Sequence, residues 1–185
     1  MQEHFDVLVV GAGISGIGAG YHLQTKCPGT SYAILEGRDA IGGTWDLFKY
    51  PGLRSDSDMY TLGFRFKPWK EQEAIADAPS ILKYLKETTE EFGIDKKIRF
   101  NKYVKAASWV SQESKWILEV EDTKNSDIQK ISCNFLFMCS GYYSYKSGYT
   151  PEFKGVEDFH GDVIHPQKWK KDYNYINKRI IVVGS

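Results

Sequence analysis

The sequence lacks any surplus of charge, because 24 Lys and Arg residues balance 24 Asp and Glu residues over 185 positions. A protein that binds nucleic acid usually carries a basic surplus, so this balance argues against a nucleic-acid partner. The composition is also unlike that of a disordered chain, since 42% of the residues are hydrophobic and 15% are aromatic. The length suits one domain, or one domain and the start of another.

Cysteine is scarce, and the histidines show no metal-ligand spacing. The three cysteines, Cys27, Cys133 and Cys139, form no CxxC pair. The last two lie six positions apart on one expected strand, where they are separated by about 20 Å, too far for a disulfide. These features predict no metal site, and the unpaired thiols fit a reducing cytosol.

The amino terminus has no basic segment of the kind that begins a signal peptide. Residues 7–23 are mostly apolar, but five glycines interrupt them, and they divide into a strand, a turn and a helix. The sequence therefore predicts no membrane span and a cytoplasmic protein.

The first 36 residues have the pattern of a β-α-β unit. Residues 5–10 are a short apolar run typical of a buried parallel strand. Apolar side chains then recur at helical spacing over residues 14–21, and a second strand is expected over residues 31–35. This order predicts an α/β, Rossmann-like fold with a parallel sheet.

Further elements extend this prediction. Residues 37–58 are rich in turn signals, and a helix is expected over residues 79–92, capped by Asp77 or Ser80. Three strands are expected to form a small antiparallel meander, and a fourth is expected to return to the parallel sheet: 103–110, 116–121, 128–133 and 134–139.

The carboxyl-terminal quarter divides into two predicted parts. Residues 143–177 are polar and aromatic and are interpreted as an inter-domain linker that follows a domain of residues 1–142. Residues 180–184, Ile-Ile-Val-Val-Gly, repeat the theme of residues 7–11, Val-Leu-Val-Val-Gly. Residues 178–185 are therefore predicted to be the first strand of a second dinucleotide-binding domain, truncated at its first glycine.

Gly11, Gly13 and Gly16 form a GxGxxG motif between the first strand and the first helix. In a dinucleotide-binding fingerprint these glycines permit a tight turn, the approach of a pyrophosphate and close helix packing. Glu36 ends the next strand 20 positions after Gly16, where an acid accepts hydrogen bonds from ribose hydroxyls and disfavours a 2′-phosphate. The alternative is a glycine-rich turn without a ligand, which this context makes the weaker interpretation.

Three further segments resemble the class B flavoprotein monooxygenases, a family that includes the flavin-containing and Baeyer–Villiger monooxygenases. They are Ile-Gly-Gly-Thr-Trp at 41–45, Tyr-Pro-Gly-Leu-Arg-Ser-Asp at 50–56, and an FxGxxxHxxxW pattern at 159–169. A glycine turn with a core tryptophan is the alternative for the first segment. The resemblance covers essentially the whole chain and is greatest to the ketone-oxidising branch.

The resemblance implies roles for particular residues. The FAD-contacting set includes the fingerprint and extends along the pyrophosphate and ribityl chain: Gly11, Gly13, Ser15, Gly16, Glu36, Gly43, Thr44, Trp45, Asp56 and, near the adenine, Val104. Arg54 and Ser55 are placed near the nicotinamide. Asp56 is given a supporting catalytic role, orienting an arginine that lies beyond residue 185. For Arg54 and Asp56 the alternative is a solvated ion pair in a loop.

The function that the resemblance implies is NADPH-dependent monooxygenation with FAD, of the Baeyer–Villiger type, in which O2 converts a ketone to an ester or lactone. The 185-residue chain alone is expected to be inactive, and either to self-associate through its last strand or to leave that tail disordered. One alternative is an amine- or sulfide-oxidising flavin monooxygenase acting on a heteroatom substrate. Another is a non-catalytic FAD-binding module, or a subunit completed by a second chain.

Overall fold

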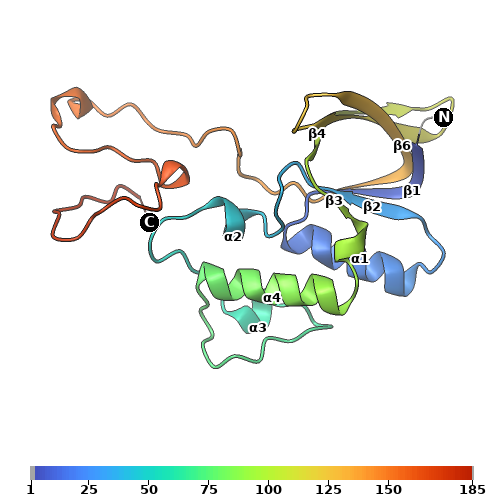
Figure 1. Ribbon diagram of the computed structural model, residues 1–185, viewed down its shortest axis with the longest axis horizontal. Coiled ribbons are helices and arrows are strands. Elements are labelled where there is room, and N and C mark those ends of the chain that lie inside the picture. The colour runs from blue at the N-terminus through green and yellow to red at the C-terminus, as the bar shows by residue number, and fades with distance from the viewer. Residues whose placement is uncertain (1–2, 185) are drawn as a thin grey trace.

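A six-stranded mixed sheet forms the centre of the computed structural model, which describes residues 3–184. The strand order is β3-β2-β1-β6-β5-β4 (Figure 1). The strands are β1 Glu3–Val10, β2 Tyr32–Leu35, β3 Ile98–Arg99, β4 Lys102–Val110, β5 Lys115–Asp122 and β6 Ile128–Met138. The helices are α1 Ile14–Lys26, α2 Thr44–Leu47, α3 Met59–Leu62 and α4 Ala78–Glu91, with short 3-10 turns at Asp95–Lys97, Val156–Asp158 and Pro166–Lys168. The predicted α/β, Rossmann-like class is confirmed.

The amino-terminal β-α-β unit is confirmed. β1 pairs in parallel with β2 on one side, where Val9 lies opposite Ile34. On its other side β1 pairs in parallel with β6, where Val9 lies opposite Phe137. β1 is therefore a central strand, which explains why its sequence is apolar on both faces.

The meander is confirmed with one correction. Two separate strands were expected over residues 128–133 and 134–139, but β6 is a single strand of 11 residues. Its first half pairs antiparallel with β5, and Cys133 lies opposite Trp116 at the end of that ladder. Asn134, at the junction, adopts the strand conformation and forms no turn, so one extended segment serves both the meander and the parallel sheet.

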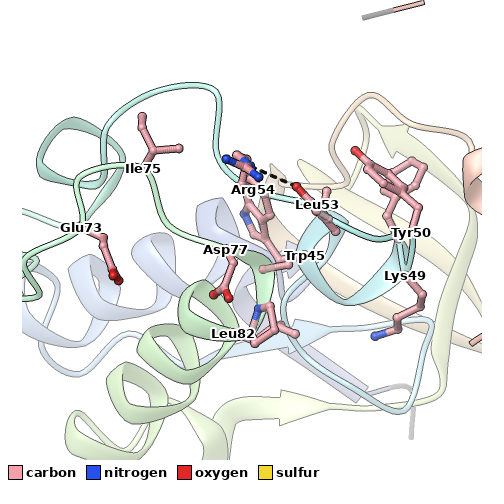
Figure 2. Close-up of a pocket in the computed structure, with 13 residues that line it drawn as sticks. Trp45, Lys49, Tyr50, Leu53, Arg54, Glu73, Ile75, Asp77 and Leu82 are labelled. Carbon is pink, nitrogen blue, oxygen red and sulfur yellow. Dashed lines mark hydrogen bonds between the residues drawn. The ribbon is translucent and has the colours of Figure 1, made fainter. Parts of the chain in front are cut away.

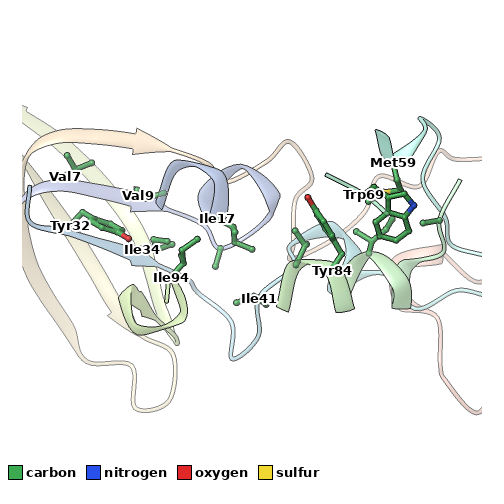
Figure 3. Packing of buried hydrophobic residues seen from close by; sticks show 14 residues of the cluster. Val7, Val9, Ile17, Tyr32, Ile34, Ile41, Met59, Trp69, Tyr84 and Ile94 are labelled. Atoms are coloured by element: carbon green, nitrogen blue, oxygen red, sulfur yellow. The ribbon is translucent and has the colours of Figure 1, made fainter. Parts of the chain in front are cut away.

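Two apolar clusters hold the layers together. One lies between the sheet and helices α1 and α4, and it includes Val9, Ile17, Ile34 and Leu85, all 0–1% exposed (Figure 3). The other lies on the opposite side of the central strands, where Leu8 packs with apolar residues of β5 and β6. Figure 1 shows the two helices on one side of the sheet and the meander curling away on the other.

Helix α4 begins where the sequence indicates. The Asp77 carboxylate accepts a hydrogen bond from the Ser80 amide at 2.9 Å, so Asp77 and not Ser80 caps the helix. Pro79 lies in the first turn, where a missing amide hydrogen costs nothing. By contrast, α2 and α3 were not predicted, because each is one turn long and lies in a segment rich in turn signals. β3 has two residues, too few for a recognisable pattern.

Residues 140–184 contain no strand and only the last two 3-10 turns. Figure 1 shows this segment, orange to red, extending away from the sheet. The strand expected from residue 178 is not formed over residues 178–184, which have no neighbouring strand with which to pair, and Ser185 lies outside the described residues. The boundaries at 142/143 and 177/178, and the second dinucleotide-binding domain, stay predictions. No helix within residues 3–184 has the length and apolar character needed to cross a membrane.

Candidate dinucleotide-binding site

The turn between β1 and α1 is tightly packed at its first and third glycines. Gly11 has a φ of +102°, and a Cβ there would lie 2.5 Å from the carbonyl oxygen of Cys139. A Cβ on Gly16 would lie 1.8 Å from the carbonyl oxygen of Gly11. The close approach of helix to strand that the fingerprint requires is therefore present.

The Gly42–Gly43 segment lies directly against this turn. The Gly42 amide donates to the carbonyl of Ala12 at 3.0 Å. A Cβ on Gly43 would lie 3.2 Å from the Cα of Gly13, and Gly43 has a φ of +54°. Gly13 is also the N-cap of α1 and supplies no side-chain cap, so the first amides of the helix stay available to an anion. The two glycine motifs, 30 positions apart, thus form one cradle of closely packed backbone, in which Gly13 is half-buried and Gly43 is buried.

Glu36 binds the backbone of the first glycine turn through its carboxylate. Its side chain is buried at the end of β2, 6% exposed. One carboxylate oxygen accepts from the Ala12 amide at 2.8 Å, and the other accepts from the Arg38 amide at 3.0 Å. An ionised carboxylate has about four acceptor positions, so two remain for ribose hydroxyls. The arrangement fits the predicted role of Glu36.

A charged cluster that the sequence analysis did not identify borders the cradle. The Arg38 guanidinium is paired with Asp46 and donates to the carbonyl of Gly43 at 3.4 Å. Lys49 also donates to Asp46, at 3.1 Å. Burial of Asp46 opposes its ionisation, but the hydrogen bonds from Lys49 and Arg38 outweigh burial and lower the pKa of this carboxyl group. Nothing in the local sequence distinguishes Arg38 from an ordinary surface arginine.

A cavity of about 660 Å³ lies next to α2. Figure 2 shows Arg54 and Trp45 among its lining side chains. The other lining residues come from the turn-rich segment and the start of α4: Phe48, Lys49, Tyr50, Gly52, Leu53, Glu73, Ile75, Asp77, Ala78, Pro79 and Leu82. Because Thr44 and Trp45 begin α2 directly after Gly43, the cavity adjoins the glycine cradle. A volume of this size is typical of a small-molecule or cofactor site.

The three residues at 54–56 have different surroundings, and their predicted contacts with FAD and nicotinamide stay predictions. Arg54 lines the cavity, and its Nε donates to the carbonyl of Gly52 at 3.2 Å, so it does not form the alternative ion pair with Asp56 in the described chain. Ser55 is 2% exposed, and its hydroxyl accepts from the Ala76 amide at 3.1 Å. Ser55 therefore holds two chain segments together and does not face the cavity. Asp56 is exposed and is not among the lining residues.

Ser15 and Val104 lie on different elements of the fold. Ser15 is in the first turn of α1. Val104 is on β4, and its side chain packs against the second apolar cluster. The Lys102 amide at the start of the same strand donates to the carbonyl of Glu36 at 2.8 Å, so the backbone of β4 passes close to the predicted ribose site. The contact between Val104 and an adenine stays a prediction.

The residues of the FxGxxxHxxxW pattern make their close contacts within residues 148–175. A Cβ on Gly148 would lie 2.0 Å from the His165 ring, and one on Gly161 would lie 2.6 Å from the Phe159 ring. His165 accepts from the Gln167 amide at 3.1 Å, and Trp169 stacks edge-on against two tyrosines. Within residues 3–184, no three His, Cys, Asp or Glu side chains converge in a way that could hold a metal ion.

These features agree with comparisons to known proteins. Residues 67–185 match the family model described as flavin-binding monooxygenase-like, and residues 9–77 match the model of an NAD(P)-binding Rossmann-like domain. The chain belongs to the flavin-binding monooxygenase-like family, which confirms the resemblance on which the sequence analysis relied.

Among similar proteins is the FAD-containing monooxygenase EthA of Mycolicibacterium smegmatis, 57% identical over all 185 residues. EthA of Mycobacterium tuberculosis strain H37Rv is 55% identical, and the probable FAD-binding monooxygenase AlmA of Acinetobacter baylyi is 45% identical, again over the whole chain. In each case the chain spans 37% of the relative's length.

Solved structures show the same likeness. A steroid monooxygenase bound to NADP superposes with a TM-score of 0.74 at 30% identity, covering 91% of this chain and 32% of that one. The enzyme OTEMO in complex with FAD and NADP superposes with a TM-score of 0.72 at 27% identity, covering 94% and 32%.

Proposed function

We propose that this chain binds the ADP half of FAD in the cradle formed by its two glycine motifs. The observation that carries this proposal is the direct contact of Gly43 with Gly13 above the buried carboxylate of Glu36. Glycine backbone, which carries no side chain, lets a pyrophosphate approach closely, and a carboxylate accepts from the ribose hydroxyls. A 2′-phosphate would be repelled by Glu36, so NADP is expected to bind this site more weakly than FAD.

We further propose that the chain is part of an NADPH-dependent monooxygenase of the Baeyer–Villiger type. When bound, FAD supplies the redox chemistry and the activation of O2. The residues of this chain hold the dinucleotide, and the cavity lined by Trp45 and Arg54 lies where the remainder of the cofactor, or a small ketone, could be enclosed. The similarity to a steroid monooxygenase bound to NADP supports the NADPH-dependent part of this proposal, and amine or sulfide oxidation is the alternative reaction. Residues 3–184 contain one β-α-β unit with a fingerprint, so the 185-residue chain alone is expected not to oxidise NADPH.

The test of FAD binding is a fluorescence titration of the 185-residue chain with FAD. Glu36→Ala should weaken binding by about 1–3 kcal/mol, or roughly 5- to 150-fold, because hydrogen bonds to a charged group are lost. Glu119→Ala, which alters an exposed glutamate on β5, is the control and should bind as the wild type does. Equal affinity of Glu36→Ala and wild type would contradict the proposed site.

A further inference from the structure

Tyr145 reaches the glycine cradle from a segment remote in sequence. Its hydroxyl lies 3.3 Å from the position that a Cβ on Gly43 would take, and that position is 3.2 Å from the Cα of Gly13. The Arg38 guanidinium lies 5.8 Å from the centre of the Tyr145 ring. The Tyr145 side chain therefore lies beside Gly43, which packs against Gly13, and beside the cation that borders these glycines.

The segment around Tyr145 contacts three other parts of the chain. Tyr143 packs edge-on against Phe48 at 5.2 Å, and Lys146 lies 5.8 Å from the ring of Tyr103 on β4. The carbonyl of Ser144 accepts from the Gln167 side chain at 2.8 Å. These contacts link the segment to α2, to β4 and to the FxGxxxHxxxW segment, so Tyr145 is positioned by the fold.

We propose that the Tyr145 hydroxyl donates a hydrogen bond to the pyrophosphate of the bound dinucleotide, an inference that rests on the proposed function. The second glycine of the fingerprint, Gly13, is the place where a pyrophosphate approaches the backbone, and the Tyr145 hydroxyl lies next to Gly43, which packs against Gly13. A phenol is a good donor to a phosphate oxygen. Burial raises the pKa of Tyr145, so the hydroxyl keeps its proton at neutral pH.

The test compares Tyr145→Phe with wild type by calorimetric titration of the 185-residue chain with FAD, ADP and adenosine. Removal of the hydroxyl should lower the affinity for FAD and for ADP by about tenfold, the usual effect of losing a hydrogen bond to a charged group. Binding of adenosine, which has no phosphate, should be unchanged. Tyr149→Phe, at a tyrosine that is 85% exposed, is the matched control and should bind all three as wild type does.

The outcomes separate this inference from the proposed function. If wild type binds FAD and ADP, and Tyr145→Phe binds each of them with the same affinity as wild type, Tyr145 makes no phosphate contact and the inference is wrong. Tighter binding by Tyr145→Ala would also overturn it, since the side chain would then obstruct the cradle. If wild type binds neither FAD nor ADP, the proposed function itself fails.

A different observation concerns the edge of β6. Residues 134–138 pair with β1, but the ladder with β5 ends at Cys133, so one edge of these five residues has no strand partner in the described chain. Phe135, Phe137 and Met138 on this half-strand are 43–59% exposed. An open edge flanked by apolar side chains is a template for strand addition.

The same chain contains a segment of matching character. Ile180, Ile181, Val182 and Val183 are 59–81% exposed and belong to no strand. We infer that residues 179–183 of a second copy pair with residues 134–138, so that two copies associate through an exchange of these segments. Each Ile or Val that becomes buried contributes roughly 1.5–3 kcal/mol, which favours the exchange at high protein concentration.

Sedimentation velocity over a range of concentrations tests this inference. Wild type should form dimers as the concentration rises, and Ile181→Lys should remain monomeric because a charge cannot be buried in the new strand. The control is Val163→Lys, at a valine of residues 140–184 that is 63% exposed and lies outside residues 179–183. This variant should dimerise as wild type does. A wild type that is monomeric at every concentration, or an Ile181→Lys variant that dimerises equally, would overturn the inference.

Discussion

Residues 7–10 and residues 180–183 have nearly the same apolar sequence, yet the first set forms a central strand and the second forms none. Leu8 and Val9 are fully buried, whereas Ile181 and Val182 are about 80% exposed. The difference lies in the partners, because β1 has a hydrogen-bonded strand on each side and residues 180–183 have no strand beside them. An apolar, β-branched run is therefore not sufficient for a buried strand, which also needs neighbouring strands to pair with.

The same contrast extends to residues 3–139 and residues 140–184. The large aliphatic side chains that are fully buried all lie in the first region. The second region is held by aromatic pairs, ring contacts and turns. Stability should therefore depend on residues 3–139, and this difference can be measured with matched substitutions.

The largest expected effect is on unfolding of the sheet. Ile34→Ala should lower the free energy of unfolding by about 2–5 kcal/mol, because it leaves a cavity between β2 and α1. Ile176→Ala, at an isoleucine that is 72% exposed, should change it by less than about 0.5 kcal/mol. Urea denaturation followed by circular dichroism measures both. Comparable losses would mean that residues 140–184 contribute to the stability of the sheet.

The structure of residues 3–139 was predicted better than that of residues 140–184, because most elements of the first region have packing partners within that region. The fingerprint, Glu36 and the strands on either side are local patterns that the fold satisfies with local partners. The division of β6 into two strands was wrong, because sequence does not reveal that one strand serves two ladders. Arg38 and Tyr145 were missed because they reach the cradle only through tertiary structure. The hydrogen bond of the Ser55 hydroxyl to a neighbouring loop was likewise not visible in the sequence, and the place of Ser55 near a nicotinamide stays a prediction.

A smaller effect should separate two glycines of α1. Gly16→Ala should cost about 1–3 kcal/mol of stability, because its methyl group would meet the backbone carbonyl of Gly11, which cannot move aside. Gly18→Ala would place its methyl group 3.1 Å from the Phe64 ring, a side chain that can adjust, and should be close to neutral. Thermal unfolding of the two variants compares them. If Gly18→Ala loses as much stability as Gly16→Ala, the contact of α1 with Phe64 would be as intolerant of a methyl group as the contact of Gly16 with Gly11, which would contradict this prediction.

The smallest expected effect concerns the cap of α4. Asp77→Ala should lower stability by about 1 kcal/mol at neutral pH, the usual value of an N-cap. The hydrogen bonds from Ser80 lower the pKa of Asp77 in the folded chain, so this contribution is complete above the unfolded pKa of about 4 and is lost as pH falls through the folded pKa. Asp77→Asn keeps a capping oxygen without a titrating group. Its stability relative to Asp77→Ala should therefore stay constant with pH, and denaturation curves at pH 7 and pH 3 check the difference.

The central claim is that two glycine motifs of the first region form one cradle for the pyrophosphate of FAD. The most direct measurement is titration of the ¹⁵N-labelled chain with FAD while amide chemical shifts are recorded. The account predicts saturable shifts at Gly11, Gly13, Gly16 and Gly43, together with Tyr145, and small changes along the β4–β5 hairpin tip. Saturable binding that leaves the amides of both glycine motifs unshifted would contradict the account.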